Sequence, residues 1–305
     1  GHDDIQAARE RRMMLSILRG FALAPLVSPL GITMAVILAN MPSLTWATLA
    51  PVALPTAGLF FLLGWWLDWQ LRPGHLASRV PHTAPPSLTP LWQFTLLALA
   101  ITLGVFAVSI AAELRLPVAV LVACPLSAIL WMALQRQRLG GGTGLPRALT
   151  LLGRHSRLIF GANRGEIAVL GGSACLGALI TPLIDPQMLH EMLLATHLQG
   201  AAMAVAAMLL VVALAQIGLN PIVSVTLLAS LLGDGVGADP RLLAVGLMCA
   251  WSLSMISSPF TASMLVLSQL IGRSPYRIAW RWNGVFFLLV VPMLALWIGV
   301  LGQWL

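Results

Sequence analysis

Several long stretches of this chain contain no Asp, Glu, Lys or Arg. A helix needs about 20 apolar residues to cross the hydrocarbon core of a bilayer, so each stretch is long enough to cross at least once. Hydrophobic residues make up 59% of the chain and charged residues only 9%, which predicts an all-α integral membrane protein in a lipid bilayer. The uncharged stretches include 20–67, 192–233, 242–272 and 282–305.

Within these stretches a small polar residue precedes a proline three times, at Ser28-Pro29, Asn220-Pro221 and Ser258-Pro259. A Ser or Asn N-cap followed by Pro in the first turn is typical of a helix start. These starts fall near the middle of predicted spans. A helix that begins there directs free backbone N–H groups and its positive dipole end toward the bilayer centre. Secondary transporters build binding sites from such discontinuous helices.

The net charge of +7 is carried by arginine alone, since the chain has no lysine. The arginines gather between the uncharged stretches, which indicates membrane topology and not nucleic-acid binding. Arg9, Arg11, Arg12 and Arg19 place the N-terminus in the cytoplasm by the positive-inside rule. The same rule predicts an outward span at 21–41, a return at 46–67 and a cytoplasmic loop at 70–89. Two further spans follow at 90–112 and 117–135. A basic segment at 136–164, with an interfacial helix at 145–160, then leads into an outward span at 166–184.

The stretch 192–233 is too long for one crossing, because a single helix of this length would measure about 63 Å. Its one strong breaker is Gly218-Leu219-Asn220-Pro221, and the limb that follows is too short to cross. A re-entrant hairpin that enters and leaves on the outer side satisfies both constraints. It also keeps Arg273, Arg277 and Arg281 in the cytoplasm.

The stretch 242–271 is then an inward-running helix broken at Ser258-Pro259, and 283–304 is a last outward span. Aligning Ser28-Pro29 on Ser258-Pro259 also pairs Met34 with Met264 and Val36 with Val266. The first copy runs outward and the second inward, which is typical of inverted-repeat transporters. The predicted division is therefore the end of a first repeat at 1–69, a cytoplasmic loop at 70–89 and a second repeat at 90–305.

This order of elements resembles the ion transporter superfamily, in particular its divalent-anion:sodium symporters. Residues 90–305 match a complete second half, and 20–67 match the end of a first half. Since the chain begins with Gly1 and not Met, the resemblance implies that an N-terminal part is missing. It also implies a homodimer. The tip reads Gly-Leu-Asn-Pro where dicarboxylate carriers have Ser-Asn-Thr, and the break reads Ser-Ser-Pro-Phe-Thr-Ala-Ser where they have Thr-Pro-Pro-Asn. The resemblance therefore predicts the architecture of this chain better than its substrate.

The resemblance implies that the hairpin tip and the facing helix break together hold the coupling ion and the substrate. The matching residues are Gly218, Asn220, Pro221 and Ser224 at the tip, Ser257, Ser258, Pro259, Thr261 and Ser263 at the break, and Ser28, Gly31 and Thr33 in the first half.

The chemistry of these residues favours sodium as the coupling ion. Hydroxyl, amide and backbone carbonyl oxygens suit Na⁺, with Asn220 and Ser258 as predicted ligands, and half-helix N-termini suit an anionic group. A proton relay normally uses an intramembrane acid, whereas no charged residue lies deep inside a predicted span. For Gln216 both packing and ligation stay open, and Asn283 is predicted to be a helix-end residue.

The function favoured by the sequence is a secondary active transporter that moves a small anionic solute by alternating access, with no catalytic residue and no cofactor other than Na⁺. An integral membrane enzyme on lipid-linked substrates stays open, although His75, Arg79, His82 and His155 have no metal or nucleophile spacing. A non-catalytic membrane subunit of a larger complex also stays open. The lysine-free composition fits a GC-rich bacterial genome and hence a bacterial inner membrane. The last outward span predicts a periplasmic C-terminus.

Overall fold

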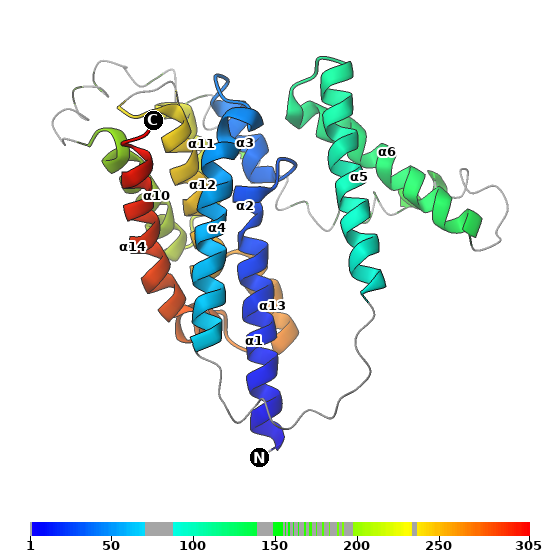
Figure 1. The fold of residues 1–305 in the computed structure, drawn as a ribbon, viewed down its shortest axis with the longest axis horizontal. Coiled ribbons are helices and arrows are strands. Elements are labelled where there is room, and N and C mark those ends of the chain that lie inside the picture. Colours follow the sequence, from blue (N-terminus) through cyan, green and yellow to red (C-terminus); the bar gives the residue numbers. More distant parts are fainter. Residues whose placement is uncertain are drawn as a thin grey trace. The chain divides into compact units, whose positions relative to one another are not determined.

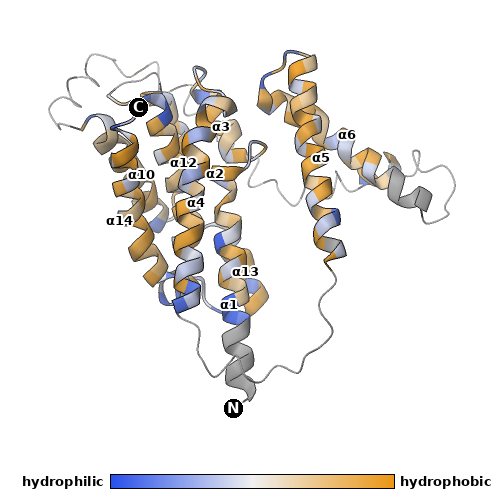
Figure 2. Ribbon diagram, in the orientation of Figure 1, coloured by the Kyte–Doolittle hydropathy of each residue, from blue (hydrophilic) through white to orange (hydrophobic). Residues whose placement is uncertain are grey.

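A computed structural model describes residues 2–70, 88–138, 149–154, 198–233 and 237–305, with single residues between 156 and 191. These residues form helices and turns but no strand, which confirms the all-α class. Hydrophobic residues cover most of the helices (Figure 2), and the long apolar segments indicate a membrane protein. In the described part of the chain, five segments are long and apolar enough to cross a membrane: Glu10–Asn40, Trp46–Gln70, Leu91–Ala111, Pro240–Ile271 and Gly284–Leu301.

The contacts divide the chain into two compact units, residues 81–168 and residues 1–80 with 169–305. The smaller unit contains α5 (Thr89–Ala111) and α6 (Leu116–Arg138), which pack as an antiparallel pair (Figure 1). The Leu114 N–H donates to Ser109 O and the Ser109 hydroxyl donates to Leu114 O, which closes the turn. Helix α5 matches the predicted span 90–112. Helix α6 covers the residues of the predicted span 117–135, but its apolar part, Leu116–Met132, is shorter than a candidate span.

The larger unit contains both predicted breaks and the described part of the predicted hairpin. Residues 71–87 of the predicted loop, most of 139–197 with the predicted span 166–184, and the first residues of the predicted hairpin lie outside the described residues. The helices of this unit are α1 (His2–Ala22), α2 (Ala24–Val27), α3 (Ile32–Asn40), α4 (Trp46–Gln70), α10 (Gly200–Gln216), α11 (Pro221–Leu232), α12 (Pro240–Ser257), α13 (Ala262–Ile271), the π-helix η3 (Arg277–Trp282) and α14 (Gly284–Leu301).

The first span is longer than predicted. Helix α1 already runs through the arginines that were expected to precede the span at 21–41, and the apolar segment begins at Glu10. Arginine is a good helix former, and no proline interrupts the chain before Pro25. Arg277 and Arg281 lie in η3, which leads into α14.

Helix α12 forms the centre of the larger unit. The apolar window of the segment Pro240–Ile271 is 100% buried, whereas no other candidate span exceeds 39%. Helices α10, α11 and α14 pack around α12, as do α1, α2 and α4. The closest approach is at Gly246, where a Cβ atom would lie 2.7 Å from Ala204 O of α10. A glycine here allows two backbones to meet, as is typical of membrane helix packing.

The helices of this unit run in two directions (Figure 1). The series α1–α3 runs from the N-terminal end toward the end where the chain terminates, and α12–α13 runs the opposite way. The open end of the α10–α11 hairpin lies with the C-terminal end of the unit, because Gly302 packs against Ala201. In addition, the Ser230 hydroxyl of α11 donates to Asn40 Oδ1 at the end of α3, over 2.7 Å.

We predict that Gly246→Ala destabilises the protein by about 1–3 kcal/mol, because the added methyl group must displace the α10 backbone. The matched control is Gly58→Ala in α4, where no atom lies within 4 Å of the added Cβ. Alanine is a better helix former than glycine, so Gly58→Ala should leave stability unchanged or raise it. Thermal unfolding in detergent measures both variants, and equal melting temperatures would contradict the close packing of α10 on α12.

The start of α12 predicts a pH effect on stability. Asp239 caps the helix by accepting from the Arg241 N–H at 2.8 Å and from the Arg241 guanidinium. The side-chain hydrogen bond from Arg241 lowers the pKa of Asp239 below its ordinary value of 3.8. A lowered folded-state pKa stabilises the protein above the ordinary value, and this stabilisation disappears as the pH falls through the lowered pKa.

Asp239→Asn keeps a capping oxygen but loses the charge. We expect its melting temperature to fall less than that of the unmodified protein between about pH 5 and pH 3. Parallel pH profiles for the two proteins would contradict this role for the Asp239 carboxylate.

Candidate functional site

The turn between α10 and α11 contains the predicted hairpin tip. Gly218 adopts φ +96°, a conformation that only glycine reaches without strain. The Asn220 Oδ1 atom accepts from the Ile222 N–H at 3.0 Å, and Pro221 occupies the first turn of α11. The sequence Gly-Leu-Asn-Pro thus ends one helix and begins the next within four residues, as predicted.

The predicted break in the segment 242–271 lies between α12 and α13. The expected helix starts at Ser28-Pro29 and Ser258-Pro259 are wrong, because each serine is the C-cap of the helix before it, and α3 and α13 begin only at Ile32 and Ala262. Ser258 and Thr261 have extended backbone conformations on either side of Pro259 and Phe260. The Phe260 N–H donates to Ser258 Oγ at 3.2 Å instead of a backbone carbonyl one turn earlier. The Thr261 hydroxyl donates to Ser258 O at 3.2 Å, which completes a local turn.

The break between α2 and α3 repeats this backbone conformation. Ser28 has φ −93° and ψ 113°, and Ser258 has φ −82° and ψ 128°. Three residues later Gly31 has φ −72° and ψ 154°, and Thr261 has φ −71° and ψ 145°. The two breaks therefore have the same length and register, as the alignment of Ser28 on Ser258 predicts.

The hairpin tip contacts the second break directly. The Ser258 hydroxyl donates to Ala215 O at 2.7 Å, and Gln216 Nε2 donates to Ser257 Oγ at 3.1 Å. The ring of Phe260 lies 3.7 Å from the position of a Cβ atom on Gly218. The segments predicted to face each other across the site are thus in contact.

Four helix ends converge at this contact. The carbonyl ends of α10 and α12 and the N–H ends of α11 and α13 all lie within the residues of the tip and the break. Helix C-termini carry partial negative charge and attract cations, whereas helix N-termini attract anions. The arrangement thus provides electrostatic positions for both a cation and an anion.

Several polar atoms near these ends lack hydrogen-bond partners although they are buried. A buried acceptor or donor without a partner normally costs about 1–3 kcal/mol, so such atoms point to a function or to an absent ligand. Ser224 and Ser263 belong to the predicted site, Gln216 was left open by the sequence, and Ser252 was missed. The four atoms are Gln216 Oε1, Ser224 Oγ, Ser252 Oγ and Ser263 Oγ.

Gln216 Oε1 is the best placed of these atoms for a cation, because Gln216 is the last residue of α10 and its amide nitrogen already contacts the break. The two residues predicted to bind sodium use their side-chain oxygens within the chain. Asn220 Oδ1 caps α11, and Ser258 Oγ both donates to Ala215 O and accepts from Phe260 N–H.

The predicted residues of the first half lie apart from this hydrogen-bonded contact. Ser28 and Gly31 flank the first break, and Thr33 is buried in the first turn of α3. Helix α2 packs on α12 and α3 packs on α11. Within the described residues, no side-chain hydrogen bond joins Ser28, Gly31 or Thr33 to the tip or to the second break.

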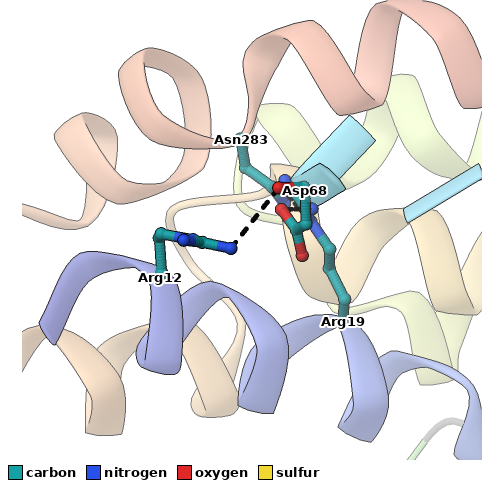
Figure 3. Close-up of polar contacts among 4 residues, drawn as sticks. All are labelled: Arg12, Arg19, Asp68 and Asn283. Atoms are coloured by element: carbon teal, nitrogen blue, oxygen red, sulfur yellow. Dashed lines mark hydrogen bonds and ion pairs between the residues drawn. The ribbon is translucent and has the colours of Figure 1, made fainter. Parts of the chain in front are cut away.

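A buried charged network joins α1 to the last turn of α4 and the start of α14. Arg19 is only 7% exposed, and its guanidinium donates to Asp68 Oδ1 at 2.8 Å and to Asn283 Oδ1 at 2.9 Å (Figure 3). The Phe286 ring lies 4.4 Å from the guanidinium carbon. The sequence places Arg19, Asp68 and Asn283 at the same membrane side of three spans, but the boundary predicted at residue 21 left Arg19 in solvent.

The described residues contain no group of three or more His, Cys, Asp or Glu side chains that could hold a metal ion. His75, Arg79, His82 and His155, the residues considered for an enzyme, lie outside the described residues. Comparison with known proteins gives no match, whether to protein-family models, to curated proteins or to solved structures.

We predict opposite effects on stability for two substitutions in the contact. Ser258→Ala removes the bond to Ala215 O and should lower stability by about 1 kcal/mol. Gln216→Leu removes an unpaired acceptor along with its donor, so stability should stay unchanged or rise. The matched control is Ser268→Ala, since that exposed hydroxyl bonds only within its own turn, to Arg273 O.

Thermal unfolding in detergent without sodium measures these three variants. A loss of stability in Gln216→Leu as large as that in Ser258→Ala would show that the amide of Gln216 is an ordinary packing contact.

Proposed function

We propose that the protein is a secondary active transporter with the architecture of the divalent-anion:sodium symporters, which moves a small anionic solute across a bacterial inner membrane with sodium. The contact between the hairpin tip and the break at Ser258 carries this proposal, because it gathers two helix C-termini, two helix N-termini and an unpaired amide oxygen. Discontinuous helices that converge in this way form the ion and substrate sites of secondary transporters.

The dimensions of the hairpin support a re-entrant path. Helices α10 and α11 contain 17 and 12 residues, or about 25 Å and about 18 Å, whereas the hydrocarbon core is about 30 Å thick. Both limbs open at the same end of the unit, where the Gly200 N–H donates to Gly237 O. A segment that enters and leaves on one side explains both observations.

The two breaks support an inverted repeat. They share their length, register and backbone angles, and the segments that contain them run in opposite directions (Figure 1). This combination is typical of transporters built from two repeats of opposite topology. With the arginine-rich start of α1 in the cytoplasm, the C-terminus is periplasmic.

The preference for sodium now depends on ligand chemistry alone. The pair of Arg19 and Asp68 lies within the limits of two candidate spans, so a lack of intramembrane charge no longer favours sodium over protons. Gln216 Oε1 and the carbonyl ends of α10 and α12 are hard oxygen donors of the kind that suits Na⁺. The N–H ends of α11 and α13 suit the anionic solute.

The close packing of α10 on α12 bears on how the site would move. Gly246 brings the backbones of α10 and α12 into contact, so we expect the hairpin and the central helix to stay packed together. In the alternating access that the resemblance implies, they would move as a unit and carry the site with them. A homodimer remains a prediction of the resemblance.

We expect sodium to stabilise the protein against thermal unfolding more than choline does at equal ionic strength, since choline is too large for the contact. In proteoliposomes, an inward sodium gradient should accelerate uptake of at least one labelled anion from a panel of dicarboxylates, citrate, sulfate and phosphate. Gln216→Leu should abolish both effects while the protein remains folded, and Ser268→Ala should keep both.

Sodium-independent stability together with no uptake of any anion under sodium or proton gradients would reject the proposal. Uptake under a proton gradient alone would retain the transporter and reject sodium.

A further inference from the structure

We propose that Asn283 fixes the conformation of the break at Ser258 and that Arg19 orients Asn283 for this task. Both are then positioning residues for the ion site, although neither lies at the tip or the break. This role deepens the proposed function, because it concerns the same break, but the conformation of the break can be measured without transport.

The break leaves a backbone carbonyl that needs a donor. In an uninterrupted helix the Phe260 N–H would bond to Ile256 O, but here it bonds to Ser258 Oγ. Ile256 is fully buried, so no water replaces the lost donor. Asn283 Nδ2 donates to Ile256 O at 3.1 Å and thus provides the bond that the helix lacks.

Arg19 determines which way the Asn283 amide points. The guanidinium can only donate, so the Asn283 atom that it contacts at 2.9 Å must be the oxygen. The amide nitrogen is then directed toward Ile256 O. Asn283 is 0% exposed, and both of its polar ends are occupied by these two bonds.

The charge of Arg19 is held in place from two further helices. Asp68 of α4 accepts from the guanidinium, and the Phe286 ring of α14 packs over it. Phe286 in turn packs edge-on against Phe60 of α4, with 5.1 Å between the ring centroids. Arg12 contacts the backbone of Asp68, because its Nη2 donates to the carbonyl oxygen Asp68 O at 3.4 Å (Figure 3).

The network reaches the ion site through one peptide unit. Ile256 directly precedes Ser257, whose hydroxyl accepts from Gln216 Nε2. A change in the carbonyl of Ile256 rotates the backbone that positions Ser257, and therefore shifts the amide of Gln216. The pair Arg19 and Asn283 thus sets the geometry of the tip through the end of α12.

The test is hydrogen exchange of the peptide 254–264, followed by mass spectrometry on the full chain in lipid nanodiscs. Asn283→Asp keeps an oxygen for Arg19 and removes the donor to Ile256 O. We expect exchange at the break to accelerate by about fivefold, as for the loss of one hydrogen bond. The matched control is Thr56→Val, which removes a different buried bond, from Trp297 Nε1 at 2.8 Å.

Arg19→Lys is the second variant, and it decides the matter if Asn283→Asp does not fold. Lysine keeps the charge beside Asp68 but lacks the planar fork that bonds Asn283 at the same time. Faster exchange at the break in either folded variant, with Thr56→Val unchanged there, supports the proposal. Exchange at the unmodified rate, or an equal rise in Thr56→Val, overturns it.

Sodium separates this proposal from the proposed function. The unmodified protein should exchange more slowly at the break in sodium than in choline if the site binds sodium, and Asn283→Asp should lose most of that difference. If Asn283→Asp opens the break but sodium has no effect on any protein, the positioning role stands and the sodium site is rejected.

Discussion

A helix that stops inside an apolar interior leaves backbone groups without partners, and the larger unit is organised around this problem at the end of α12. Ser257 and Ser258 are buried, so side chains provide the missing bonds. The Ser258 hydroxyl accepts from the Phe260 N–H and donates to the end of α10, while Asn283 donates to Ile256 O. Two of these bonds, to Ala215 O and from Asn283, also join α12 to another part of the chain. The hairpin and the last helix are thus attached to the central helix at its weakest point.

The convergence of helix ends separates opposite charges over a short distance. Carbonyl ends and N–H ends meet where the hairpin turns, so the proposed site would attract a cation and an anion through partial charges alone. The one buried ion pair, within the described residues of the larger unit, serves a different purpose. Arg19 and Asp68 neutralise each other at the edge of the packed helices and leave the tip free of formal charge. Uncharged oxygen atoms of the protein would hold an ion less tightly than a fixed carboxylate, and the ion would therefore be released more readily.

The sequence predicted the positions of the three interruptions because proline and glycine act locally, but Ser28 and Ser258 end the preceding helix and do not cap the next one. Asn220 caps the helix that it was expected to start, and Ser28 and Ser258 share the backbone angles that their alignment required. The network of Arg19 was missed for a physical reason. Hydropathy places an arginine outside the membrane, and only tertiary packing shows that a helix continues through it and that partners on two other helices neutralise it. Gln216 was left undecided, because the sequence does not show whether an amide has partners for both of its atoms.

The separation of the network residues along the chain determines the order in which it can assemble. Arg19 and Asp68 are 49 residues apart, whereas Arg19 and Asn283 are 264 apart. The ion pair can therefore form once the first two long helices have been synthesised and inserted, which neutralises the arginine early. The carbonyl of Ile256 must wait for the last helix. Biogenesis thus completes the centre of the protein last, and a chain released before Asn283 would hold a paired arginine beside an unfinished break.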